Sequence, residues 1–410
     1  MRTKGDGTLY KDARGYWVGG VQLPPGPDGK RRYKKVVRKD YNDCLAALRK
    51  LRKELDDGTI ALSPKTTVGK WCDYWITDLL PHKKIKPSTV AGYRNTVKNY
   101  IKPRIGTKRL DKLTPADVRN LYTDLQAHVS PRAAQKADQV LRLAYKAAIR
   151  DSIVGKNIMA KVDKPPHTPA PQQAFGAKVS MLIIATAIET QGRMWGARWA
   201  LGFTTGARES EVLGLEWDRV DLDEGVIDIA WQLKREQKVH GCGDPVDGKY
   251  PCGKERMSFC PQARWEFPSW LEWRHCEGTL VFTKPKTRAG QRLVPVIPDM
   301  IPVLRDLRDI TPNPHGLVFH HDDGSPFSTE DDQAQWKALL KSAGLPHARQ
   351  HSIRHSTATL LMEYGVSEHV IASVIGHTDT ATTRGYLHVD LSLARDAWAQ
   401  LGALLPPTSM

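Results

Sequence analysis

The sequence contains no apolar run long enough to span a lipid bilayer, which excludes a protein built on transmembrane helices. Cysteine is scarce, with six residues in 410, and no secretory signal peptide is recognisable. These two features exclude a disulfide framework and predict a soluble protein of the reducing cytoplasm, without a membrane partner. Acidic residues are also few, because 45 Asp and Glu stand against 61 Lys and Arg.

The resulting net charge of +16 is typical of proteins that bind nucleic acid, since neutralising phosphates releases condensed counterions. The excess is uneven, because residues 1–60 hold 15 basic and 8 acidic side chains, which is +7 of the total. The alternative explanation is solubility, since a high net charge also keeps proteins from associating. Composition therefore favours a DNA partner without requiring one.

A length of 410 residues exceeds what one hydrophobic core usually organises, so more than one domain is expected. Residues 1–60 alternate aromatic, β-branched and basic positions and then repeat leucine at helical spacing, which predicts a small three-stranded sheet plus a helix. Residues 66–164 contain N-cap and first-turn signals for helices that begin near Val68, Ser88, Thr114 and Pro131. After a proline-dense stretch, residues 175–410 predict a mainly helical domain with a small sheet. The expected fold class is multidomain α+β.

The third segment carries cationic and proton-transferring side chains around one phenol. His351 and Arg354 stand in HSIRH, His377 and Tyr386 follow, and Arg208 lies upstream in TGARESEVLGLEW. Planar guanidinium groups match the geometry of a phosphate through paired, charge-assisted hydrogen bonds. The set therefore suits attack on a phosphodiester without a metal ion.

Taken singly, each of these residues has a structural explanation. A histidine on an apolar helix is usually satisfied within the core, and Gly376 with His377 could form only a helix C-cap. Arg208 could be a solvated charge, and Tyr386 a half-buried packing residue. Their joint occurrence in order favours function over five separate structural roles.

In order and spacing, these five residues resemble the tyrosine recombinases, the phage integrase family. Glu211 stands where the family has an acidic residue, three positions after Arg208, and nine positions separate His377 from Tyr386 as in the family. Ile353 and Ile375 replace the usual leucines but keep the apolar character. The resemblance also implies a lysine on a β-hairpin, sought in FTKPKTRAGQRLVPV.

Lys286 is assigned to that hairpin because Thr287 and Arg292 keep the expected spacing, and Lys284 is the second candidate. Gly290 stands where serine is frequent, which leaves the bend of the hairpin tip open.

The residue types fit a defined reaction. A tyrosine has an ordinary pKa of about 10, so it is a poor nucleophile until nearby cations or a base favour the phenolate. The positive field that favours the phenolate and the charged transition state would come from Arg208, Arg354 and His377. His351 is suited to accept or return the phenol proton, and Lys286 to protonate the leaving sugar oxygen. The product is a 3′-phosphotyrosyl link, which stores the bond energy, so no cofactor is expected.

The resemblance implies a site-specific DNA recombinase that integrates or excises phage or mobile-element DNA. Its partners would be double-stranded attachment sites and three further copies of the chain, because paired exchange involves four strands. A directionality factor and a host DNA-bending protein are left open. The alternatives are a catalytically silent DNA-binding regulator on the same scaffold and a metal-dependent nuclease. The nuclease is disfavoured because HSIRH lacks the glutamate of a His-Glu-x-x-His zinc helix.

The first two segments also have counterparts in the family. Residues 1–60 resemble the arm-binding domain, whose sheet enters the DNA groove, and the alternative is that the aromatic residues only pack on the helix. Its DNA-facing candidates are Tyr16, Trp17, Arg31, Arg32, Tyr33 and Lys35. Residues 66–164 resemble the core-binding, SAM-like domain, whose phosphate contacts would position rather than specify. Its candidates are Lys83, Lys84, Lys86, Arg94, Lys98 and Arg132. Residues 175–410 correspond to the catalytic domain.

Two further features stand outside this core pattern. An apolar stripe beyond Tyr386, which includes Leu401, predicts a tail that packs on its own domain or on a neighbouring protomer. An insert holds three cysteines and a histidine, which could form a tetrahedral zinc site; these are His240, Cys242, Cys252 and Cys260. Their spacing does not match a Cys-x-x-Cys knuckle, so a reduced surface loop rich in glycine and proline is the alternative.

Overall fold

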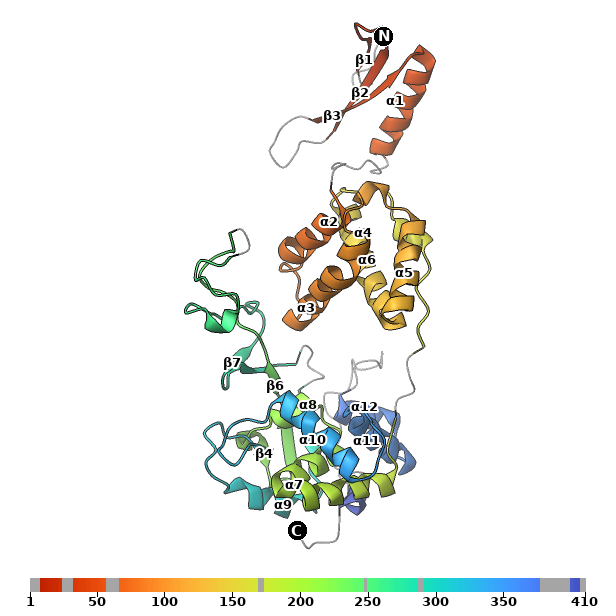
Figure 1. The fold of residues 1–410 in the computed structure, drawn as a ribbon. Helices are drawn as coiled ribbons and strands as arrows, with labels where there is room; N and C mark the ends of the chain where they lie inside the picture. Colours follow the sequence, from red (N-terminus) through yellow and green to blue (C-terminus); the bar gives the residue numbers. More distant parts are fainter. Residues whose placement is uncertain are drawn as a thin grey trace. The chain divides into compact units, whose positions relative to one another are not determined.

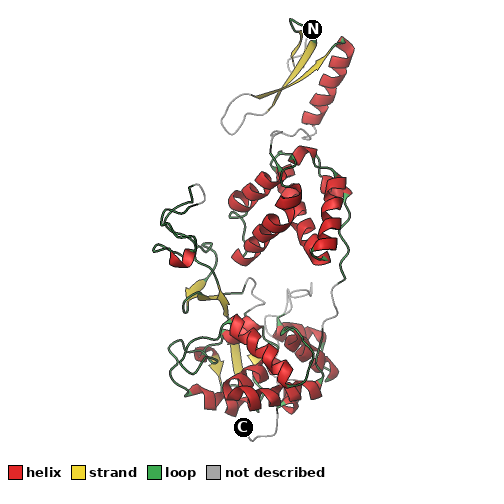
Figure 2. Ribbon diagram, in the orientation of Figure 1, coloured by secondary structure: helices red, strands yellow, loops and turns green. Residues whose placement is uncertain are grey.

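The computed structural model describes residues 8–23, 32–56, 66–168, 173–246, 249–285, 291–376 and 399–405. Helices and short strands both occur over these residues (Figure 2), so the predicted α+β class is confirmed. The chain divides into two compact units, Met1–Pro169 and Ala170–Met410, and the division falls in the proline-dense stretch. No helix within the described ranges combines the length and apolar character that crossing a membrane requires.

The first unit begins with an antiparallel sheet in the order β1-β2-β3, with helix α1 against it (Figure 1). The elements are β1 (Thr8–Lys11), β2 (Trp17–Leu23), β3 (Arg32–Arg38) and α1 (Tyr41–Asp56). Val21, Leu48 and Leu51 form the buried core of this small layer. Gly19 permits the close approach of the helix, because a Cβ at this position would lie 3.2 Å from Leu48 Cδ1. The sheet therefore relies on one helix face for its burial.

From Thr66 onward, the described residues of the first unit form mainly helices. Its elements are α2 (Val68–Tyr74), the π-helical turn η1 (Trp75–Leu79), α3 (Pro87–Thr96), the π-helical turn η2 (Val97–Ile101), α4 (Lys102–Ile105), the 3₁₀ turn η3 (Leu110–Lys112), α5 (Pro115–His128), α6 (Pro131–Arg150) and the 3₁₀ turn η4 (Ile158–Lys161). Thr67, Thr114 and Ser130 each accept a backbone N–H at the start of α2, α5 and α6. These caps explain why helices begin close to the predicted positions.

In the second unit, the described residues form helices and two three-stranded antiparallel sheets, ordered β4-β5-β9 and β6-β8-β7. Its strands are β4 (Val220–Asp221), β5 (Val226–Ile229), β6 (Gln232–Arg235), β7 (Trp273–His275), β8 (Leu280–Thr283) and β9 (Arg292–Pro295). Its helices and 3₁₀ turns are α7 (Ala177–Thr205), α8 (Glu209–Leu213), η5 (Trp217–Arg219), η6 (Met257–Phe259), α9 (Met300–Arg308), α10 (Thr329–Ser342), α11 (Ser352–Glu363), α12 (Glu368–Ile375) and η8 (Gln400–Leu404).

Helix α7 is the centre of this unit and packs against α9, α10, α11 and η8. Its direction changes at Gly192, whose φ of 81° lies in a region that other residues rarely adopt. Trp199 and Phe203 on its second half are fully buried in the main hydrophobic core. Leu401 is also fully buried there, so the described part of the C-terminal tail packs on its own unit.

A buried ion pair joins α7 to α10. Arg198 Nε and Nη2 donate to the two carboxylate oxygens of Asp332 at 2.5 and 2.7 Å, and both side chains are almost completely buried. Removing one partner from such a pair leaves an uncompensated buried charge, which costs about 3–5 kcal/mol. The pair therefore fixes how α10 lies on the helix that leads into Arg208.

Candidate active site

A buried carboxylate organises the arginines of the second unit. Glu211 on α8 is fully buried, and its Oε1 accepts a hydrogen bond from Arg208 Nη1 at 2.8 Å. Its Oε2 accepts from Arg292 Nη2 on β9 at 2.8 Å. Burial raises the pKa of Glu211, but the charges and hydrogen bonds of Arg292 and then Arg208 outweigh it and lower the pKa to about 2. The carboxylate is therefore ionised and holds two guanidinium groups side by side.

Arg354 on α11 adds a third guanidinium. Its Nη1 donates to the carbonyl of Gly206 at 2.8 Å, and only 2% of the residue is exposed. Its Nη2 is buried and has no hydrogen-bond partner within the described residues. Burial, and then repulsion from Arg208 and Arg292, lower the pKa of Arg354 to about 9, so it is still a cation at neutral pH. Over the part of the chain that the structure describes, one buried cationic donor thus lacks an acceptor, and an anion would satisfy it.

The C-terminal end of α12 joins the same cluster. Arg208 Nη2 donates to the carbonyl of Gly376 at 2.8 Å, and Arg292 Nε donates to the carbonyl of Val374 at 2.5 Å. Gly376 ends α12 in the left-handed conformation with φ of 78°. It is therefore a helix C-cap, as its structural explanation predicts. Two arginines therefore hold the point at which the chain leaves α12 toward His377.

His351 stands at the N-terminus of α11, three positions before Arg354, and thus on the same side of that helix. It is exposed, and its ring lies edge-on to His355 with a centroid separation of 4.8 Å. An open cavity of about 610 Å³ lies beside it, lined among others by Glu209 and Trp336. Burial, and then the charge of Asp332, raise the pKa of Glu209 to about 7. The structure therefore brings Arg208, Arg354 and His351 into one region.

The other three predicted catalytic residues, Lys286, His377 and Tyr386, lie outside the described residues. Lys284, the second candidate for the hairpin lysine, forms an ion pair with Glu272, and its ammonium lies 5.4 Å from the centre of the Trp231 ring. It is therefore already engaged by a carboxylate and an aromatic face.

Sequence reasoning did not assign Arg292 a place in the site. In the sequence, Arg292 only supports the position of the predicted hairpin. In the structure, it shares Glu211 with Arg208, and its side chain is almost fully buried. Gln232 on β6 was also missed, and its Nε2 donates to Glu211 Oε1 at 3.3 Å. The available signal was the acidic residue three positions after Arg208, because a buried carboxylate needs more than one partner.

The candidate DNA contacts of the sheet differ in exposure. Tyr33 and Lys35 on β3 are exposed, whereas Tyr16 and Trp17 are half-buried. Trp17 packs edge-on against Tyr41 of α1, with ring centroids 4.9 Å apart. This contact agrees with the alternative that the aromatic residues of the sheet pack on the helix. Arg32 begins β3, and Arg31 lies outside the described residues.

The candidates of the helical segment lie on and around α3 and at the start of α6. Lys86 is the N-cap residue of α3, Arg94 lies on that helix, and Lys98 lies one turn further on η2. Arg132 is the second residue of α6 and donates to Gln135 Oε1 at 2.9 Å. Apart from Lys86, which is half-buried, these side chains and those of Lys83 and Lys84 are exposed. Within the first unit, these exposed side chains are accessible to a DNA phosphate backbone.

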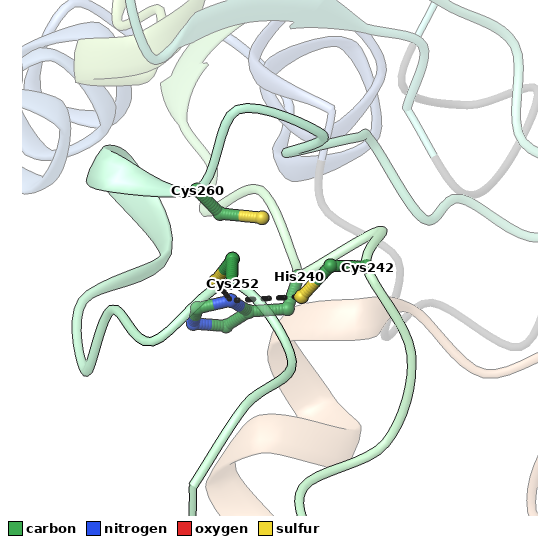
Figure 3. Close-up of side chains that lie close together, drawn as sticks. All are labelled: His240, Cys242, Cys252 and Cys260. Atoms are coloured by element: carbon green, nitrogen blue, oxygen red, sulfur yellow. Dashed lines mark hydrogen bonds between the residues drawn. The ribbon is translucent and has the colours of Figure 1, made fainter.

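The cysteines of the insert converge, although their spacing matches no short knuckle. The imidazole of His240 and the thiols of Cys242, Cys252 and Cys260 place one ligand atom each within 4.8 Å of one another (Figure 3). Burial disfavours the Cys260 thiolate, but the backbone N–H groups of Gln262 and Gly241 and the neighbouring thiols outweigh this and lower its pKa to about 6. Among the described residues, this is the group with a metal-ligating composition.

The sequence matches the phage integrase family over residues 270–392 and the N-terminal SAM-like domain of phage integrases over residues 67–126. It is 27% identical to an integrase of Saccharopolyspora erythraea over 96% of this chain and 95% of the relative. It is 26% identical to the tyrosine recombinase XerD of Corynebacterium glutamicum over 79% of this chain and 95% of the relative.

Solved structures show the same fold. The Tn1549 transposon integrase in complex with a circular intermediate DNA has a TM-score of 0.59 at 18% identity, and covers 82% of this chain and 99% of its own. A lambda integrase tetramer bound to a Holliday junction has a TM-score of 0.54 at 15% identity, and covers 93% of this chain and 98% of its own. With the arginine cluster already described, the matches to the phage integrase catalytic and SAM-like domains and to curated integrases and recombinases identify the chain as a tyrosine-type site-specific recombinase.

Proposed function

We propose that this chain cuts and rejoins DNA strands by way of a covalent 3′-phosphotyrosyl bond to Tyr386. The observation that carries the proposal is Arg354, a buried guanidinium whose Nη2 has no acceptor within the described residues. Arg208 lies close enough to repel it, and the ionised Glu211 compensates only part of the positive charge. A phosphate that gains negative charge in the transition state meets donors that are already oriented, so little reorganisation is needed.

The reaction follows from the chemistry of the assigned residues. The Tyr386 oxygen attacks the phosphorus, the bond to the 5′ oxygen of the next nucleotide breaks, and that oxygen leaves with a proton from Lys286. His351 takes the phenol proton, while His377 and the two catalytic arginines stabilise the equatorial oxygens. The reverse attack by a hydroxyl from another strand releases the tyrosine. Each step exchanges one phosphate ester bond for another and so keeps the bond energy, which is why the reaction requires no cofactor.

The two N-terminal segments would hold the DNA. Residues 1–60 are proposed as the arm-binding domain, residues 66–164 as the core-binding domain and residues 175–410 as the catalytic domain. The net charge of +16 and the exposed basic side chains around α3 support a phosphate-backbone contact in the second of these. Because such contacts carry no base information, they would position the site rather than select it.

The assembly on DNA is proposed to contain four protomers, as in the lambda integrase tetramer bound to a Holliday junction. The substrates would be attachment sites on phage or mobile-element DNA and on the chromosome, which places the enzyme at the cytoplasmic nucleoid. A directionality factor, which would select integration or excision, and a host DNA-bending protein are candidate partners.

A nicked suicide substrate tests the proposal, because loss of the short strand after cleavage traps the covalent intermediate. The substrate is cut from the DNA that flanks the gene, and the trapped protein is digested and its peptides are weighed. The expected result is one nucleotide adduct on the peptide that contains Tyr386.

Tyr386→Phe should bind the same DNA without forming the adduct, whereas the matched variant Tyr364→Phe, at the end of α11, should form it normally. A tagged peptide without residue 386 contradicts the assignment of the nucleophile. If the unaltered chain binds DNA that recombines in cells but forms no adduct with it, the chain is better explained as a catalytically silent regulator.

A further inference from the structure

The loop between β6 and β7 is long and has almost no hydrophobic core. Among its described residues from Glu236 to Glu272, Cys260 is the one buried side chain. The loop is nevertheless folded back on itself, because Val239 and Arg264 exchange backbone hydrogen bonds at 2.8 and 3.0 Å. A segment of this size that buries so little apolar surface needs another source of stability, such as a cross-link or a metal.

The point at which the two arms meet carries the candidate ligands. Gly241 stands between His240 and Cys242, and a Cβ at this position would lie 2.0 Å from the carbonyl oxygen of Gln262. Only glycine therefore lets the arm with His240 and Cys242 approach the arm with Cys260. The imidazole of His240 is held by the ring of Tyr250, with centroids 3.6 Å apart and planes within 6° of parallel.

The distances match a tetrahedral centre. Zn–S bonds of about 2.3 Å and a Zn–N bond of about 2.0–2.1 Å at tetrahedral angles separate nitrogen and sulfur by about 3.6 Å. His240 Nδ1 lies 3.4 Å from Cys252 Sγ and 3.8 Å from Cys242 Sγ. All four ligand atoms lie within 4.8 Å of one another, and the four side chains come from different parts of the loop and point toward one another (Figure 3).

We propose that His240, Cys242, Cys252 and Cys260 bind one Zn²⁺ that holds this loop in its fold. Three thiolates and one imidazole select zinc over magnesium or calcium, which prefer oxygen. The protein supplies all four ligands and leaves no open position, so the ion is structural. The alternative cross-link, a disulfide, would use two of the three thiols and leave the third and the histidine without a role; all three are free cysteines here. The proposal does not depend on the recombination mechanism.

The test measures metal in the full-length chain, purified without added metal or chelator. Elemental analysis should give about one zinc per chain, and Cys252→Ser and Cys260→Ser should each lose most of it. Cys276→Ser is the matched control, because Cys276 is a half-buried free cysteine outside the cluster, and it should keep its zinc. Replacing zinc with cobalt should give the visible absorption of a tetrahedral cobalt–thiolate centre in the unaltered chain.

Two readouts remain informative if a serine variant folds poorly. In the unaltered chain, zinc should protect Cys242, Cys252 and Cys260 from alkylation, and removing it with a chelator should expose all three. Chelation should also open the loop to trypsin at Lys254 and Arg256, both exposed, while the rest of the unit stays intact.

Less than about a tenth of an equivalent of zinc, with no uptake of added zinc or cobalt, overturns the proposal. So does a disulfide between any two of the three thiols in protein purified under reducing conditions, or equal loss of zinc from Cys276→Ser. None of these assays uses DNA, so their failure is distinct from failure of the proposed recombination.

Discussion

Replacing Glu211 with glutamine should destabilise the second unit and disorganise its arginines. The change keeps the size of the side chain and removes the charge that holds Arg208 and Arg292. These arginines lower the pKa of Glu211 from 4.5 to about 2 against the effect of burial. That difference corresponds to about 3 kcal/mol in favour of the ionised form, and losing one member of a buried ion pair typically costs about 3–5 kcal/mol. We therefore expect a loss of about 3 kcal/mol in the free energy of unfolding at neutral pH.

The pH dependence has a definite sign. Because the folded pKa of Glu211 lies below its unfolded value, its contribution to stability is fully present above about pH 4.5 and is lost as the pH falls toward about 2. The difference in stability between the unaltered chain and Glu211→Gln should therefore be largest near neutral pH and shrink in acid. Urea denaturation at several pH values, followed by the fluorescence of buried tryptophans such as Trp199, measures it.

The neighbouring glutamate provides the control. Burial, and then Asp332, raise the pKa of Glu209 to about 7, so its ionised form is disfavoured in the folded protein. Glu209→Gln should therefore leave stability at neutral pH unchanged or slightly higher. The reasoning is refuted if Glu211→Gln unfolds at the same urea concentration as the unaltered chain near neutral pH, or if its deficit stays constant down to about pH 3.

Other changes test other contacts. Arg354→Lys removes the planar donor pair and the bond to Gly206, so the covalent adduct should form about 10²-fold more slowly or worse, while DNA binding measured by gel shift stays close to normal. Asp332→Asn leaves the buried Arg198 uncompensated and should lower the free energy of unfolding by about 3 kcal/mol, as measured by urea denaturation; an unchanged midpoint would show that the pair is neutral. If the face around α3 contacts phosphates, Arg94→Gln together with Lys98→Gln should weaken DNA binding for all sequences alike. The slope of log affinity against log salt should then fall by about 2, and an unchanged slope would remove both residues from the interface.

Local signals in the sequence predicted much of the architecture. Thr114 and Ser130 cap helices at the positions where their side chains can accept a backbone N–H. Arg208, His351 and Arg354 were predicted from spacing and residue type, and they come together in the second unit. The fold follows because each helix start depends on residues only a few positions away.

Contacts between distant residues were harder to predict. Arg292 reaches Glu211 from 81 positions away, and nothing in its neighbourhood distinguishes it from an exposed strand residue. The cysteines of the insert converge because Gly241 lets two arms cross closely, whereas their linear spacing disfavoured a metal site. Trp17, a candidate DNA contact, also packs edge-on against Tyr41, the first residue of α1, and its local pattern does not reveal this partner. Such outcomes depend on tertiary packing, which local patterns do not encode.

The strand order β6-β8-β7 has a consequence for how this protein can change over evolution. Both outer strands run antiparallel to β8, so they are parallel to each other and lie on its opposite edges. A tight turn cannot join parallel strands, since the chain must travel back along the sheet and over one strand before it re-enters. The insert is therefore also an obligatory return path. Natural relatives or engineers can replace what it carries, but any shortened version must still bridge from Arg235 to Trp273.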